Sequence, residues 1–208
     1  MVESAPAGGA GHFGGVWDGL TAFADMIVRE GEKRGLVGPR ELDRLWTRHI
    51  LNSAAVLDYI PRAGSVIDVG SGAGFPGLVV AICRPECTVT LVDSMERRCI
   101  WLSDAIDELG LSNAEVINAR SESLPATVRA DVVTARAVAR LKKLLGWTMP
   151  LVGAGGSLIA LKGVSVDEEI DEAVGELKRY RAAFADVHVV QQFGSEERTH
   201  VLEVRKKA

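Results

Sequence analysis

One stretch, residues 66–77, constrains the fold of this chain more than any other. An apolar, β-branched run leads into glycines at positions 70, 72, 74 and 77, with a proline at position 76. β-Branched residues favour a buried parallel strand, and glycines allow positive φ angles and leave no Cβ between backbone and ligand. Proline is tolerated in a first helical turn. The stretch therefore predicts a strand, a tight turn and a helix start, beside which a nucleotide can bind.

The glycine spacing admits two classes of nucleotide cofactor. Read from Gly72, it fits the G-x-G-x-x-G pattern of dinucleotide-binding proteins. Read from Asp68, it fits the acid-x-G-x-G-x-G turn found in class I S-adenosylmethionine-dependent methyltransferases. Asp93 ends the next predicted strand, about 20 residues further on, where a carboxylate reaches ribose hydroxyls. Both classes predict that acid; a tight turn that binds nothing is the remaining interpretation.

Length and charge limit the class of protein. The 208 residues predict one domain, and the net charge of −4 means that a nucleic acid would have to meet a local basic patch. Three scattered cysteines predict reduced core thiols, and no Cys or His spacing predicts a metal site. The sequence shows neither a signal peptide nor an apolar run that could span a bilayer, which predicts a cytoplasmic protein without membrane contact.

Hydrophobic periodicity divides the chain into three parts. Residues 1–15, rich in Gly and Ala, predict a disordered tail, residues 16–64 a helical cap, and residues 65–208 a Rossmann-like core in the same domain. The cap has one predicted helix over 16–30 and a second from Pro39 to about 57. The core has predicted strands at 66–69, 88–92, 115–118, 130–134, 156–161, 187–193 and 201–205, and helices at 95–109 (with Ser94 as N-cap), 141–151 and 167–184.

Alternating strands and helices predict an α/β fold, with a parallel sheet covered by helices on both faces. The polar turn at 194–198 predicts that the last two strands pair antiparallel. This ending is typical of the Rossmann-like class I methyltransferase fold, which has a seven-stranded, mostly parallel sheet with an antiparallel last strand. A nicotinamide-binding sheet would usually continue with parallel strands. The two leading helices are extra to such a core.

Several motifs together resemble one family, the bacterial 16S rRNA guanine-N7 methyltransferases called RsmG, glucose-inhibited division protein B or GidB. The motifs are Arg-His-Ile-Leu-Asn-Ser (48–53), Asp-Val-Gly-Ser-Gly-Ala-Gly-Phe-Pro-Gly (68–77), Leu-Val-Asp-Ser (91–94), Ala-Arg-Ala (135–137), Ala-Leu-Lys-Gly (160–163) and Glu-Arg (197–198). Many family members carry Asp where this chain has Asn52. The resemblance implies S-adenosyl-L-methionine as cofactor and the 16S rRNA of the small ribosomal subunit as partner.

The resemblance also implies which residues form the site. The implied cofactor contacts are Gly70, Gly72, Gly74, Phe75, Asp93, Ser121, Glu122 and Arg136. Phosphate contacts and stacking would hold the RNA. The candidates are Arg48, His49, Arg136, Lys162 and Arg198, with Arg140, Lys142, Lys143 and residues 205–207 as further basic residues. Two interpretations are open: the set forms one basic mouth, or several members are solvated helix charges and only some contact RNA. Arg136 and Lys162 are the foremost candidates, because each directly follows a predicted strand.

The implied chemistry needs no catalytic residue. Guanine N7 carries a lone pair and no proton, and the sulfonium is already an activated methyl donor, so the protein's task is placement and exclusion of water. No Asn/Asp-Pro-Pro-Tyr follows the fourth predicted strand, which argues against methylation of an exocyclic amine. Glu86 separates Pro85 from Cys87, which argues against a cysteine nucleophile for carbon-5 methylation.

Three alternatives stay open at this level. An NAD-dependent oxidoreductase would use the second glycine reading, although neither Tyr59 nor Tyr180 is followed by Lys four residues later. A module that binds S-adenosylmethionine or RNA without turnover would keep the same motifs. A methyltransferase with a small-molecule acceptor would keep the cofactor turn alone. For the family activity we expect a monomer acting on a structured RNA target.

Overall fold

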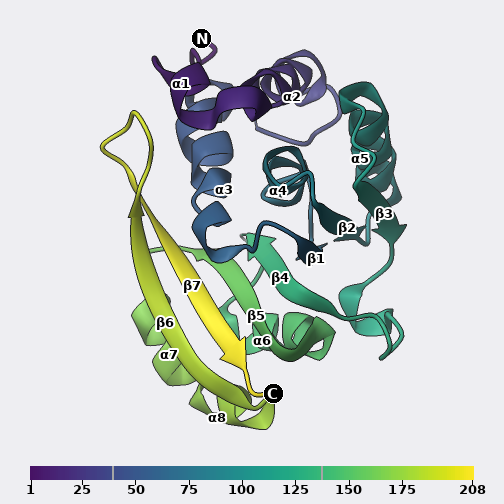
Figure 1. Cartoon of the computed structure of the whole chain (residues 1–208), viewed down its shortest axis with the longest axis vertical. Helices are drawn as coiled ribbons and strands as arrows, with labels where there is room; N and C mark the ends of the chain where they lie inside the picture. Colours follow the sequence, from purple (N-terminus) through teal and green to yellow (C-terminus); the bar gives the residue numbers. More distant parts are fainter. Residues whose placement is uncertain (39, 137) are drawn as a thin grey trace.

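A single seven-stranded sheet runs through the computed structural model, which describes residues 1–38, 40–136 and 138–208 (Figure 1). Its strand order is β3-β2-β1-β4-β5-β7-β6, and β7 lies antiparallel between β5 and β6, whereas β1 to β5 are mutually parallel. The predicted class I methyltransferase sheet is confirmed. The strands are β1 (Gly64–Val69), β2 (Cys87–Asp93), β3 (Ala114–Asn118), β4 (Ala130–Arg136), β5 (Val152–Lys162), β6 (Ala182–Gln191) and β7 (Arg198–Lys206).

Helices cover both faces of the sheet because alternate strand residues point to opposite sides. Val66 of β1 packs into one buried apolar cluster, and its neighbour Ile67 packs into the other. The first cluster lies under α2 (Trp17–Glu30), α4 (Gly77–Cys83) and α5 (Glu96–Leu109). The second lies under α6 (Leu141–Thr148), α7 (Val166–Glu172) and α8 (Val174–Arg179). Among the described residues, no helix is long and apolar enough to cross a bilayer.

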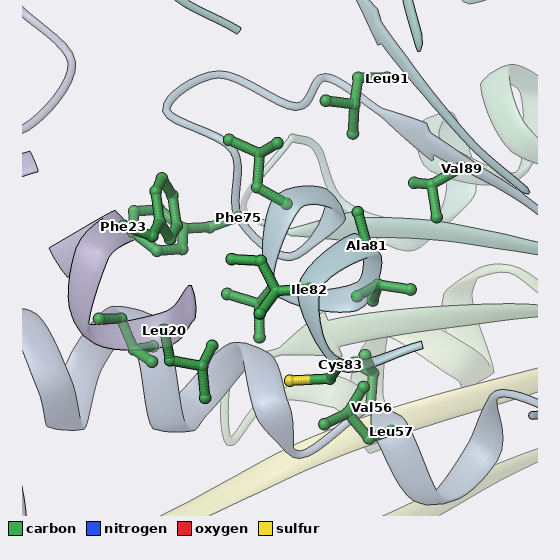
Figure 2. Close-up of a cluster of buried hydrophobic side chains, with 14 of the residues drawn as sticks. Leu20, Phe23, Val56, Leu57, Phe75, Ala81, Ile82, Cys83, Val89 and Leu91 are labelled. Atoms are coloured by element: carbon green, nitrogen blue, oxygen red, sulfur yellow. The ribbon is translucent and has the colours of Figure 1, made fainter. Parts of the chain in front are cut away.

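The cap joins the first cluster through aromatic and aliphatic contacts (Figure 2). Phe23 of α2 packs against Phe75, with ring centroids 5.2 Å apart. Leu20, one turn earlier, is fully buried in the same cluster as Ile82 of α4. The leading helices therefore bury apolar surface against the glycine turn and the helix that follows it.

The prediction of a disordered tail over residues 1–15 is wrong. Two short helices, α1 (Gly9–Phe13) and η1 (Gly14–Val16), occupy this segment. The Glu3 carboxylate accepts hydrogen bonds from the backbone N–H groups of Trp46 (2.7 Å) and Thr47 (3.0 Å). His12 stacks on Phe193 at 4.0 Å between ring centroids. These partners lie far along the chain, so the local Gly- and Ala-rich composition could not reveal them.

The second cap helix is less regular than predicted. Its predicted start, Pro39, lies outside the described residues. The segment that follows consists of η2 (Leu42–Arg44), the π-helical η3 (Leu45–Leu51), α3 (Asn52–Ala54) and η4 (Leu57–Tyr59). An amphipathic pattern indicates which face is buried but does not distinguish these helix types, because their periods are close.

Several boundaries in the core also differ from the sequence expectation. The strands expected at 156–161 and 187–193 begin earlier, at Val152 and Ala182. The predicted helix over 167–184 is broken at Ala173 and ends at Arg179, and Phe184 belongs to β6, where pairing with β7 determines the conformation. The N-cap of α5 is Met95, not Ser94. Short helical turns complete the core at η5 (Ser121–Ser123) and η6 (Met149–Leu151).

Candidate functional site

The glycine turn after β1 has the predicted backbone geometry. Gly70, Gly72 and Gly74 have φ angles of 73°, 58° and 104°, in the region that residues with a Cβ rarely adopt. At Gly74 a Cβ would also lie 2.4 Å from Cδ1 of Leu78, so side-chain volume is excluded there as well as disfavoured by backbone strain. At the carboxyl edge of the sheet, the turn therefore exposes backbone groups that no Cβ separates from a ligand.

The buried carboxylate of Asp68 stabilises this turn from the protein interior. Asp68 has no exposed surface; its Oδ1 accepts a hydrogen bond from the Thr134 hydroxyl (2.8 Å) and its Oδ2 one from the Gly77 N–H (3.2 Å). Burial raises the pKa of Asp68 to about 6 despite these donors. The acid that begins the motif thus ties β1, β4 and the start of α4 together and does not line the cavity above the turn.

A second carboxylate orients the opposite side of the turn. Asp93, at the end of β2, accepts hydrogen bonds from the Gly72 N–H at Oδ2 and from the Met95 N–H at Oδ1, both at 2.9 Å. Its Oδ2 also lies 3.6 Å from Nη1 of Arg98. Each carboxylate oxygen has further lone-pair capacity, and Asp93 lines the cavity above the turn, so it can accept hydroxyl donors from a ligand.

The cofactor candidates converge on one cavity of about 600 Å³, which we call the turn cavity. Seven of the eight residues line it, and the eighth, Gly74, supports the turn from outside the lining. Ser121 and Glu122 reach it from η5, where the Ser121 hydroxyl donates to the Glu122 carboxylate at 3.1 Å. Sequence reasoning missed other lining residues, which carry no local motif: Leu36, Val37, Gly38, Glu41, Met95, Arg98, Arg120, Val138 and Trp147.

A neighbouring cavity of about 710 Å³, here the basic cavity, shares Glu41, His49, Arg136 and Val138 with the turn cavity. It opens over the carboxyl ends of β4 and β5 and the hairpin end of β7. Its cationic lining residues are Arg48, Arg136, Arg140, Lys162 and Arg198. The four shared residues form the boundary between the two cavities.

A hydrogen-bonded chain fixes this boundary. Arg136 donates to the Arg48 carbonyl (3.1 Å) and to Nδ1 of His49 (3.0 Å), while Nε2 of His49 lies 2.9 Å from the Glu41 carboxylate. Burial and then the Arg136 charge lower the pKa of His49 to about 4, so the imidazole is neutral with its proton on Nε2. Burial lowers the pKa of Arg136 to about 10, so this side chain stays cationic at neutral pH, 4.8 Å above the Phe75 ring.

The structure separates the RNA-contact candidates into two groups. Arg48, His49, Arg136, Arg140, Lys162 and Arg198 surround the basic cavity. Of the two interpretations, the structure favours the second for Lys142, Lys143 and residues 205–207, which line neither cavity. Lys142 pairs with Glu176 at 3.7 Å and Lys143 lies over Trp147 at 4.7 Å. Residues 205–207 lie at the opposite sheet edge, because β7 runs antiparallel and Arg205 pairs with Ser157.

Lys162 is less accessible than a phosphate contact would require. Its side chain is 8% exposed, its Nζ lies 2.6 Å from the Glu169 carboxylate, and it donates to the Ala139 carbonyl at 3.0 Å. Arg198, by contrast, is exposed at the start of β7. Among the described residues, no carboxylate lies within ion-pair distance of Arg198, so its guanidinium is available to a phosphate.

The three cysteines are free and buried in the structure. Burial raises the pKa of Cys83 to about 12, which keeps the thiol protonated and poorly nucleophilic. In the described part of the chain, no group of three or more His, Cys, Asp or Glu side chains is arranged to hold a metal ion. None of these three thiols lines the turn cavity or the basic cavity.

Comparison with known sequences finds one family over nearly the whole chain. Residues 17–200 match the model of the GidB family, rRNA small subunit methyltransferase G. A protein of that name from Beutenbergia cavernae is 48% identical over 90% of this chain and 88% of its own length. Another from Leifsonia xyli subsp. xyli is 45% identical over 97% of this chain and 96% of its own.

Solved structures resemble the fold at low sequence identity. TYW2 from M. jannaschii, determined in complex with AdoMet, superposes with a TM-score of 0.63 at 15% identity, covering 79% of this chain and 78% of its own. The N-methyltransferase NodS from Bradyrhizobium japonicum, with S-adenosyl-L-homocysteine, gives a TM-score of 0.57 at 14% identity, covering 85% and 96%. At these identities the likeness shows the fold alone.

Proposed function

The chain belongs to the family of rRNA small subunit methyltransferase G, and from this premise we propose that it transfers a methyl group from S-adenosylmethionine to N7 of a guanine in the 16S rRNA of the small ribosomal subunit. The observation that carries the proposal is the pair of adjoining cavities with a shared boundary. One has the features of a nucleoside site and the other those of a site for a polyanion.

The turn cavity is proposed to hold the cofactor. Its volume of about 600 Å³ lies within the range usual for small-molecule sites. Asp93 would accept the ribose hydroxyls, and Ser121 with Glu122 would flank the adenine. Gly70 and Gly72 would bring backbone against the nucleoside, and Phe75 and Arg136 would close the end where the methyl group leaves.

The basic cavity is proposed to receive the guanine and its phosphates. Arg48 and Arg198 are the proposed phosphate contacts, because both side chains are exposed beside the boundary. The boundary residues Arg136 and His49 would orient the base toward the turn cavity. Because the imidazole of His49 is neutral and fully engaged, it is not a general base, which agrees with a reaction that removes no proton.

Residues 16–64 are proposed to act as a cap on the cofactor site, within a single methyltransferase domain completed by residues 65–208. Leu36, Val37, Glu41 and His49 from this segment line the turn cavity, so the cap contributes walls to the site as well as packing. The cytoplasmic location and the monomeric state stay predictions.

Transfer of labelled methyl from S-adenosylmethionine to small subunits tests the proposal; the subunits should come from cells lacking this gene. Nuclease digestion and mass spectrometry should find 7-methylguanosine at one site. Asp93→Ala should abolish transfer, whereas Asp131→Ala, whose carboxylate binds Ser65 (2.8 Å) away from both cavities, should retain it. S-adenosylhomocysteine binding without transfer would mean another acceptor or a binding module. Binding of NAD alone would overturn the cofactor assignment.

A further inference from the structure

We propose that Lys162 and Glu169 are a positioning pair for the loop at residues 138–140 and that Lys162 does not contact RNA. The inference rests on the proposed function, because the loop forms part of the boundary between the cofactor cavity and the RNA-facing cavity. The position of Lys162 directly after a predicted strand made it a candidate RNA contact. The proposed role is instead to hold the loop in place.

The pair contacts the loop at Ala139 and at Leu141, the residue that follows the loop and begins α6. The Lys162 ammonium donates to the carbonyl of Ala139 at 3.0 Å. One oxygen of Glu169, Oε2, takes the Lys162 ammonium at 2.6 Å and the backbone N–H of Leu141 at 2.7 Å. Lys162 ends β5 and Glu169 belongs to α7, so the loop is fastened to two separate elements.

Burial distinguishes this pair from a surface ion pair. The two side chains are 8% and 10% exposed, so solvent screens their interaction weakly. Burial by itself raises the pKa of Glu169, but the Lys162 hydrogen bond and the Leu141 N–H outweigh it and hold the pKa below its usual value. Releasing Lys162 to an RNA phosphate would leave the Glu169 carboxylate buried without its counter-charge, which is strongly unfavourable.

Residues of the loop line both cavities, so its position affects the shape of each. Val138 lies against the cofactor turn so closely that a Cβ on Gly70 would be 3.1 Å from its Cγ2, and it lines both cavities. Arg140 lines the basic cavity and pairs with Glu172 of α7 at 2.9 Å. A shift of the loop would therefore change cofactor affinity as well as RNA binding, whereas loss of a phosphate contact would change RNA binding alone.

Lys162→Met, Glu169→Gln and the double variant test the inference, with Lys142→Met as a control on an exposed lysine that lines neither cavity. The readouts are S-adenosylhomocysteine affinity by calorimetry, kcat and KM on small subunits, and the salt dependence of subunit binding. We expect each single variant to weaken S-adenosylhomocysteine binding by roughly tenfold. The double variant should bind S-adenosylhomocysteine no more weakly than either single variant. The salt slope, which is the slope of the logarithm of the subunit-binding constant against the logarithm of salt concentration, should not change.

A direct phosphate contact gives the opposite pattern. Lys162→Met would then reduce the salt slope by about one and leave S-adenosylhomocysteine affinity intact, and Glu169→Gln would bind and turn over normally. Either result overturns the inference. Should Lys162→Met fail to fold, the isosteric Glu169→Gln decides alone, because wild-type cofactor affinity in that variant also overturns it. The calorimetric arm needs no RNA, so it tests the pair even if the proposed acceptor is wrong.

Discussion

Arg136 donates a hydrogen bond to Nδ1 of His49 at 3.0 Å, and this contact joins the end of β4 to the cap. The guanidinium lies over Phe75, which itself packs on His49 and on Phe23 of α2. One cation is thus held by an imidazole, a backbone carbonyl and an aromatic ring at the boundary of the two cavities. The position of Arg136 therefore depends on the cap as well as on β4.

Replacing His49 by Phe should reduce methyl transfer without unfolding the protein. The ring still packs on Phe75, but Arg136 loses one of its two acceptors and keeps the Arg48 carbonyl. Glu41 loses the His49 donor and keeps its ion pair with Arg48 at 3.2 Å. We expect a loss of stability of about 1–3 kcal/mol and a fall in kcat/KM of at least tenfold. Unfolding in urea and methyl transfer to small subunits measure the two effects. His200→Phe, on β7, is the control; equal transfer by both variants would refute a role for the His49–Arg136 contact.

The same variant should also change the pH dependence of stability. His49 has its pKa lowered from 6.5 to about 4, so in this range the unfolded chain binds a proton that the folded chain does not. The contribution of His49 to wild-type stability therefore falls, by about 3 kcal/mol at most, as the pH drops from 6.5 toward 4. Asp68 has its pKa raised from 3.8 to about 6, so its contribution rises as the pH drops over that range and nearly cancels the first.

Removing His49 should expose the contribution of Asp68. The free energy of unfolding of His49→Phe, relative to that of wild type, should increase as the pH is lowered from 6.5 toward 4, so the variant gains relative stability. Urea denaturation at several pH values in that interval measures the difference. A difference that stays constant with pH would mean that His49 is not held neutral in the folded protein.

Alanine substitutions at two glycines with similar φ angles can distinguish the effect of backbone strain from the effect of a lost ligand contact. Gly72 and Gly155 have φ angles of 58° and 69°, and alanine at either position should cost about 1–2 kcal/mol of stability. Gly72 lines the turn cavity and Gly155 does not. Thermal unfolding should therefore show similar losses, but calorimetry should show that only Gly72→Ala loses S-adenosylhomocysteine affinity. Unchanged affinity in Gly72→Ala would place the cofactor elsewhere.

Arg198 and Arg205 lie at opposite ends of β7 and form a matched pair for RNA binding. Arg198 lines the basic cavity, whereas Arg205 donates to the Ser157 hydroxyl (3.3 Å) at the far sheet edge. Arg198→Met should raise KM for small subunits and lower the salt slope of binding by about one, with S-adenosylhomocysteine affinity unchanged. Arg205→Met should leave all three quantities near wild type. An unaltered salt slope in Arg198→Met would remove it from the RNA interface.

Much of the fold could be read from local patterns. Residues 66–77 predicted a strand, a positive-φ turn and a helix because each feature depends on the chemistry of neighbouring residues. The alternation of elements and the closing hairpin were enough for the seven-stranded sheet with its antiparallel strand. Local patterns failed at residues 1–15 and 182–184, where contacts with distant segments, such as the pairing of β6 with β7, override composition.

The residue types of the cofactor site were determined by the sequence, since glycines and acids at the ends of consecutive parallel strands must meet at one sheet edge. The roles of the charged residues were decided only by the tertiary structure. Arg136 contacts residues 87 and 88 positions away, and no local pattern reveals that its partner is a neutral histidine. Lys162 and Arg198 both lie at strand ends, yet one is buried against Glu169 and the other is exposed. Burial and counter-charge depend on which distant elements pack together, and these two quantities distinguish the buried, paired Lys162 from the exposed Arg198.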